Sequence, residues 1–197
     1  MTARQKFLKA VYPVLTGYKK LFGKRVTFIV NEKKVQPPES FYHLSVHLND
    51  GAELRLEQLK GKKVLLVNTA SDCGYTAQYE LLEKLAKRFA DKLVIVAFPA
   101  NDFNEQERGS DEEIARFCQS NFGVNFPLAK KASVVKGPGQ QEVFQWLTDK
   151  KRNGWNDKQP SWNFSKYLVS EQGVLLSYFD PAISPLSETV IKSIGVR

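Results

Sequence analysis

The sequence predicts one α/β domain with a mixed central sheet flanked by helices, preceded by a β-hairpin and a basic N-terminal extension. Two apolar runs, Lys63–Asn68 and Leu93–Pro99, have the continuous hydrophobicity of strands that are buried on both faces of a sheet. Between them, apolar residues repeat at helical spacing from Tyr79 to Phe89. A strand, a helix and a strand at this spacing predict a right-handed parallel crossover at the centre of the sheet.

The hairpin is predicted ahead of the first central strand. Residues Tyr42–Leu48 alternate between apolar and polar types, Asn49-Asp50-Gly51 is a turn sequence, and Glu53–Leu56 is the returning strand. A further strand is predicted at Val26–Val30, and Pro37-Pro38 marks the junction with the main domain.

A second helix is predicted from Ser110, because Glu113 three positions later completes a capping box. Its apolar face contains Ile114, Phe117, Cys118, Asn121 and Phe122. We therefore expect Cys118 to point inward. The remaining predicted elements are a short helix near Gln141–Lys150, strands at Tyr167–Ser170 and Val174–Tyr178, and a final helix from about Ser187.

The net charge of +8 belongs to the N-terminal extension. Residues 1–36 contain nine Lys and Arg and one acid, so that of 29 basic and 21 acidic residues, 20 of each remain in residues 37–197. We expect residues 1–36 to form a basic extension and residues 37–197 the folded domain. The balanced domain argues against nucleic acid as a partner.

The extension has apolar residues at roughly helical spacing between its Lys and Arg residues, as a helix lying on an anionic membrane surface would have. The alternative is a solvated extension that packs on the domain. Lys9 and Pro13 interrupt the apolar stretch, so we expect a retained segment rather than a secretory signal. No apolar run reaches the about 18 residues of a membrane-spanning helix. We expect a cytoplasmic protein with peripheral membrane contact at most.

The two cysteines exclude a disulfide scaffold and a four-thiolate zinc site, and we expect neither a metal nor a cofactor. Cys73 lies between the first central strand and the following helix, where the positive end of the helix dipole favours a thiolate. Thr76 occupies the second cysteine position of a C-x-x-C motif, so a dithiol within this turn is excluded. The alternative is that Cys73 is a small buried core residue.

Four sequence runs resemble the glutathione peroxidase family in order and spacing: NTASDCGYT (68–76), FPANDFNEQERG (98–109), GSDEEIARFCQSNFGVNFP (109–127) and WNFSKYLV (162–169). The resemblance covers the chain from about Phe41 to its end and implies a thioredoxin-like fold. It also implies a peroxidase with the catalytic tetrad Cys73, Gln106, Trp162 and Asn163. In this chemistry the cysteine thiolate attacks a hydroperoxide and becomes a sulfenic acid. Considered singly, Gln106, Trp162 and Asn163 also have structural alternatives, namely a loop Gln, a core Trp and a turn Asn.

Cys118 matches the resolving cysteine of the thioredoxin-dependent branch of that family. The resemblance thus implies a Cys73–Cys118 disulfide that thioredoxin reduces. Such a bond needs the two Cα atoms within about 7 Å, so the second helix must loosen during the cycle. One alternative makes Cys118 a core residue and glutathione the reductant. Others are a redox sensor that passes its disulfide to a partner protein, or a module that binds acidic surfaces.

Three residues depart from the family pattern near the expected site. The usual FPCNQF and QEPG are here FPANDF and QERG, which places Ala100, Asp102 and Arg108 where the family has Cys, Gln and Pro. Asp102 leaves the local charge and the preferred reductant open. Tetrameric animal members of the family have a long assembly loop where this chain has a short connection between Trp146 and Trp162, so the resemblance implies a monomer or a weak dimer.

Overall fold

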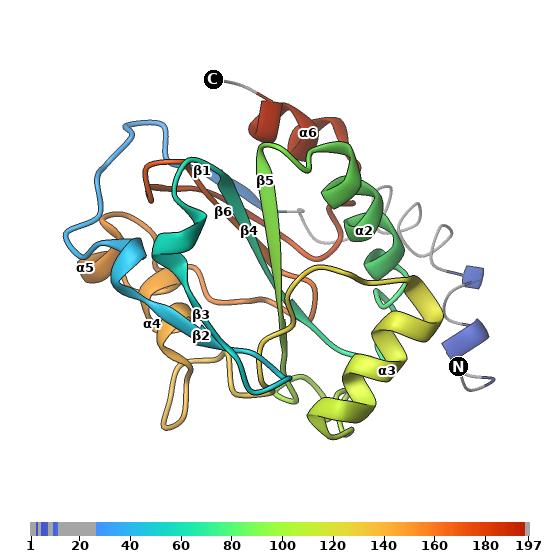
Figure 1. The fold of residues 1–197 in the computed structure, drawn as a ribbon. Coiled ribbons are helices and arrows are strands. Elements are labelled where there is room, and N and C mark those ends of the chain that lie inside the picture. The colour runs from blue at the N-terminus through green and yellow to red at the C-terminus, as the bar shows by residue number, and fades with distance from the viewer. Residues whose placement is uncertain (1–2, 4, 8–9, 12–26, 196–197) are drawn as a thin grey trace.

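A computed structural model describes residues 3, 5–7, 10–11 and 27–195 of the chain (Figure 1). The central sheet has the order β1-β7-β6-β4-β5. Its strands are β1 (Phe28–Val30), β4 (Lys63–Thr69), β5 (Leu93–Pro99), β6 (Lys166–Val169) and β7 (Leu175–Phe179). The β4–β5 pair is parallel and the other neighbours are antiparallel, so the predicted mixed sheet with a parallel centre is confirmed.

The central sheet is buried on both faces. Alternate residues of β4 point to opposite sides of the sheet, where each set packs in a different apolar cluster. Leu65 and Val67 belong to one apolar cluster, whereas Val64 and Leu66 belong to the other. Figure 1 shows one face covered by α2 (Gln78–Arg88), α3 (Asp111–Phe122) and α6 (Glu188–Gly195), and the other by the hairpin and α4 (Glu142–Leu147). This two-sided burial explains why β4 and β5 are continuous apolar runs.

The predicted hairpin forms from β2 (Ser45–His47) and β3 (Glu53–Arg55), which pair antiparallel. Its first strand is shorter than predicted, because Phe41–His43 forms a 3-10 helix, η1. Ser40 caps that helix by accepting a hydrogen bond from the backbone N–H of Tyr42. A second 3-10 helix, η2 (Leu56–Leu59), follows β3.

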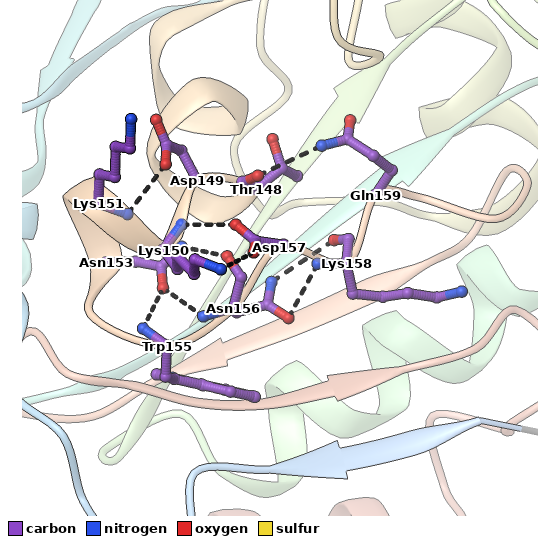
Figure 2. A network of polar contacts seen from close by, with 10 residues as sticks. All are labelled: Thr148, Asp149, Lys150, Lys151, Asn153, Trp155, Asn156, Asp157, Lys158 and Gln159. Atoms are coloured by element: carbon purple, nitrogen blue, oxygen red, sulfur yellow. Dashed lines mark hydrogen bonds and ion pairs between the residues drawn. The ribbon is translucent and has the colours of Figure 1, made fainter.

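The helix predicted near residues 141–150 is divided into α4 and α5 (Lys150–Asn153). Asp149 starts the second piece by accepting a hydrogen bond from the backbone N–H of Lys151 at 2.9 Å. Figure 2 shows Asn153 holding the following turn, with its Oδ1 accepting from the backbone N–H groups of Trp155 and Asn156 at 3.0 and 2.7 Å. The connection that precedes β6 is therefore held by hydrogen bonds between its own residues.

The last residues of the predicted extension belong to the sheet. Strand β1 pairs with β7, and Asn31 just after it donates from its backbone to Leu176 O at 2.8 Å and from its side chain to Leu175 O at 3.1 Å. The domain boundary at residue 36 stays a prediction, but β1 is an edge strand of the folded sheet.

Nearer the N-terminus, the described residues 3, 5–7 and 10–11 are helical, and Phe7 is exposed. Phe7 and Val11 are two of the apolar positions of the predicted amphipathic helix, and the remaining ones lie outside the described residues: Val14, Leu15, Tyr18, Leu21 and Phe22. In the part of the chain that the structure describes, no helix has the length and apolar character needed to span a membrane.

Candidate active site

Cys73 lies in the turn between β4 and α2 and is 1% exposed. Its Sγ accepts a hydrogen bond from the backbone N–H of Tyr75 at 3.4 Å. Thr76 closes the turn, since its hydroxyl accepts from Cys73 N at 3.0 Å and donates to Ala70 O at 2.9 Å. Because α2 begins only at Gln78, this donor comes from a turn rather than from the expected first turn of the helix. An N–H donor to the sulfur still favours the thiolate.

Gln106 and Asn163 are brought into direct contact. The Asn163 side-chain N–H donates to Oε1 of Gln106 at 3.0 Å, and Asn163 is fully buried. Gln106 is also joined to the cysteine loop, because its backbone oxygen accepts from the N–H of Asp72 at 3.0 Å. With its oxygen held by Asn163, the Gln106 amide keeps its N–H groups as donors for another acceptor.

Trp162 is half-buried and packs against the apolar cluster that contains Cys73. Its ring lies beside that of Phe103, with 5.4 Å between the centroids. Asn68 at the end of β4 holds the backbone on both sides of Asn163: its side chain donates to Trp162 O at 3.1 Å and its backbone oxygen accepts from Phe164 N at 2.6 Å. The structure thus gathers the four predicted residues around the C-terminal end of β4.

Cys118 lies on α3, is fully buried and belongs to the same apolar cluster as Cys73, and the two cysteines do not form a disulfide in this structure. Burial raises the pKa of Cys118 to about 12, with an opposing contribution from the neighbouring Tyr79 hydroxyl. That hydroxyl has no well-formed hydrogen bond among the described residues. Inside the intact helix Cys118 is therefore a protonated thiol at neutral pH.

Glu107 is a buried carboxyl group that the sequence analysis did not single out. It is 1% exposed, its Oε2 accepts a hydrogen bond from the Ser71 hydroxyl at 3.2 Å, and its N–H donates to Asn101 at 2.9 Å. Burial raises the pKa of Glu107 to about 7, against the lowering effect of Ser71. In the sequence, a Glu beside an Arg in a polar loop is typical of a solvated surface residue. The signal that could have related Glu107 to the site was its position next to Gln106.

An open cavity of about 770 Å³ adjoins this loop, and Ser71, Gln106, Glu107 and Phe117 line it together with Gln5 from the N-terminal extension. The Gln5 side chain donates to Ser71 O at 3.2 Å. Within the described residues, no group of three or more His, Cys, Asp or Glu side chains is placed to hold a metal ion.

The three departures from the family pattern have separate surroundings. Asp102 accepts hydrogen bonds from the Ser133 hydroxyl at 2.9 Å and from Val134 N at 2.8 Å. Its side chain is therefore bound to the loop that contains Ser133 and Val134. Ala100 is fully buried in the apolar cluster on the other face of the sheet. Arg108 forms an exposed ion pair with Glu105.

Sequence comparison identifies relatives over most of the chain. The family model for glutathione peroxidase matches residues 41–148. Glutathione peroxidase-like peroxiredoxin 2 of Saccharomyces cerevisiae is 44% identical over 149 residues, which covers 75% of this chain and 91% of the relative. The glutathione peroxidase homolog BsaA of Staphylococcus epidermidis is 43% identical over 148 residues, covering 75% and 92%.

Solved structures agree with this assignment. The crystal structure of Trgpx in apo form has a TM-score of 0.60 and 30% identity, and the match covers 80% of this chain and 96% of that one. A thioredoxin family protein from Chlorobium tepidum, at 16% identity and a TM-score of 0.57 over 81% of this chain and 93% of that one, shares the fold alone. This chain, with its thioredoxin-like fold, belongs to the glutathione peroxidase family and is a peroxidase.

Proposed function

We propose that Cys73 is the peroxidatic residue and that it reduces hydrogen peroxide and organic hydroperoxides, lipid hydroperoxides among them. The thiolate attacks the O–O bond and takes one oxygen to become a sulfenic acid, and the second oxygen leaves as hydroxide or alkoxide, which takes a proton from solvent to become water or an alcohol. The observation that carries this proposal is the Gln106–Asn163 pair, joined to the cysteine loop through Asp72. Amide and indole N–H groups stabilise the thiolate and the departing oxygen because they donate without taking up the substrate's proton.

Cys118 is the resolving residue in this proposal. Its sulfur attacks the sulfenic acid of Cys73, which forms the disulfide and releases water. Two yeast relatives carry the word peroxiredoxin in their names, which supports a thiol-based cycle. Because burial holds the pKa of Cys118 at about 12, the step requires α3 to open and admit solvent to the thiol.

Thioredoxin is the proposed reductant, because its dithiol can reduce an intramolecular disulfide by exchange. Peroxide consumption with the thioredoxin system and with glutathione, each on wild type and on Cys118→Ser, tests this choice. We expect wild type to turn over with thioredoxin and the variant to react once and stop. If glutathione sustains both proteins equally, Cys118 is a core residue. If neither reductant sustains turnover although Cys73 oxidises rapidly, the protein is a redox relay.

A second proposed role concerns the N-terminal extension and an anionic membrane surface. Residues 1–26, which precede the first strand, contain seven Lys and Arg and no acid. Each such charge near an anionic surface contributes about 1 kcal/mol, screened within a Debye length. This charge supports recruitment of the peroxidase to membranes, where lipid hydroperoxides form.

A further inference from the structure

Lys166 on β6 is a fully buried lysine that the proposed chemistry does not use. Its Nζ lies within hydrogen-bond distance of three oxygens: Phe164 O at 2.7 Å, Gln78 Oε1 at 3.0 Å and Pro181 O at 3.4 Å. The three N–H groups of its protonated form match these acceptors one to one, although burial lowers the pKa of Lys166 to about 7. Lysine is rarely buried completely unless its nitrogen is paired, and here three oxygens pair it.

Two of the three oxygens come from segments that hold different parts of the candidate active site. Phe164 follows Asn163 directly and has a left-handed backbone with φ of 68°, which an L-residue adopts only when its surroundings enforce it. Gln78 is the first residue of α2, five positions after Cys73. The Gln78 side chain also donates to Pro181 O at 2.6 Å, so Gln78 and Lys166 share this acceptor.

We propose that Lys166 is a positioning residue that fixes Asn163 relative to Cys73. This inference rests on the proposed roles of those two residues. By binding the carbonyl of the strained Phe164 and the side chain at the start of α2, Lys166 keeps the Asn163 turn and the Cys73 turn in one arrangement. Without it, the amide donors are held less well at the site of oxygen transfer, and a displacement of about 1 Å can cost about 100-fold in rate.

The chain contains a second buried lysine, outside the candidate site, that serves as a matched comparison. Lys63 on β4 is 4% exposed, and its Nζ donates to Ile194 O at 2.8 Å and Ser193 O at 3.3 Å at the end of α6. It lies at the opposite end of β4 from the candidate site, about 20 Å away at the rise of a strand. Replacement of Lys63 therefore removes a buried lysine and its hydrogen bonds without touching the proposed tetrad.

The test compares Lys166→Met and Gln78→Met with Lys63→Met in the full-length chain. The first readout is the second-order rate of Cys73 oxidation by hydrogen peroxide in a single turnover, expressed per folded protein from urea unfolding. The second is amide hydrogen exchange in residues 73–78 and 161–165. We expect Lys166→Met to slow oxidation at least tenfold and to accelerate exchange in both segments. Gln78→Met should show the same pattern more weakly, whereas Lys63→Met should stay within twofold in rate.

Two outcomes overturn the inference: oxidation within twofold of wild type in Lys166→Met, or equal slowing in Lys63→Met. If Lys166→Met does not fold, Gln78→Met decides by the same criteria, because it removes the acceptor on the α2 side, together with the Gln78 hydrogen bond to Pro181 O, and leaves Lys166 in place. Failure of the proposed function is recognised separately, since wild-type Cys73 would then not oxidise. Hydrogen exchange in Lys166→Met would then still show whether Lys166 holds residues 73–78 and 161–165 in one arrangement. Unchanged exchange in these segments would refute the positioning role of Lys166.

Discussion

The side chain of Asn163 donates a hydrogen bond to Oε1 of Gln106 over 3.0 Å, although the two residues are 57 positions apart. The contact joins the turn before β6 to the loop after β5. This hydrogen bond orients the Gln106 amide. Asn163 and Gln106 therefore form one hydrogen-bonded pair beside the cysteine loop, with the Gln106 N–H groups as donors.

Replacement of either member of this pair should slow the oxidation of Cys73 by hydrogen peroxide. We expect about 100-fold for Asn163→Ala or Gln106→Ala, the usual loss of a preorganised donor. The double variant should be little slower than the singles, because residues that act as a unit are not additive. Stopped-flow oxidation of the reduced protein measures these rates. Asn156→Ala, which removes another buried Asn, is the control for stability alone. Fully additive losses would contradict a coupled pair.

Glu107 should make the free energy of unfolding decrease as pH rises. Its folded-state pKa of about 7 lies above the ordinary value of 4.5, so between these values the folded state binds more protons than the unfolded state. Its contribution is complete below pH 4.5 and lost as pH rises through 7. Relative to Glu107→Gln, wild type should lose about 3 kcal/mol between pH 4 and pH 8 in urea unfolding.

The exposed neighbour Glu105 provides the control for this pH dependence. Glu105→Gln removes a surface carboxylate from the same loop and should leave the slope of unfolding free energy against pH unchanged. An identical slope in wild type and Glu107→Gln would show that the Glu107 carboxyl is solvated in the folded protein.

Oxidation should open α3, because its buried Cys118 has to reach Cys73. One equivalent of hydrogen peroxide should produce an intramolecular Cys73–Cys118 disulfide, detected by peptide mass, and faster amide exchange across α3. In Cys118→Ser the sulfenic acid should persist, and exchange in α3 should stay at its reduced level. A free Cys118 thiol in the oxidised wild-type protein would assign this residue to the core.

Removal of residues 1–26 should leave the peroxidase folded and active on hydrogen peroxide, since β1 and its pairing with β7 remain. The shortened protein should no longer sediment with anionic liposomes at low salt, whereas full-length protein should bind and be released by high salt. A chain that begins at residue 37 also loses β1 and should unfold at lower urea. Equal liposome binding by full-length and shortened protein would reject the membrane role.

The sequence predicted the parts of this fold that follow from local pattern. The apolar runs of β4 and β5 and the Ser110 capping box appear where expected, because burial on two faces and helix capping leave direct traces in the residue types. The break between α4 and α5 was missed, because it depends on side-chain bonds from Asp149 and Asn153. The short first strand of the hairpin was missed for the same kind of reason, since it depends on the Ser40 cap.

The candidate site shows the same division. Cys73, Gln106, Trp162 and Asn163 were predicted through family resemblance, and the structure gathers them around one end of β4. Glu107 and Lys166 were not predicted as special, because a charged residue in sequence is by default solvated. Their burial arises from tertiary packing, which no local pattern encodes.

The role of Cys73 as the attacking sulfur is tested most directly by peroxide consumption in the Cys73→Ser variant. Serine keeps nearly the same size in the turn, so circular dichroism and urea unfolding should match wild type. Hydrogen peroxide consumption with the thioredoxin system should fall to the uncatalysed rate, because no other residue supplies the reactive thiolate. Activity within a few-fold of wild type in a correctly folded Cys73→Ser protein would contradict the account.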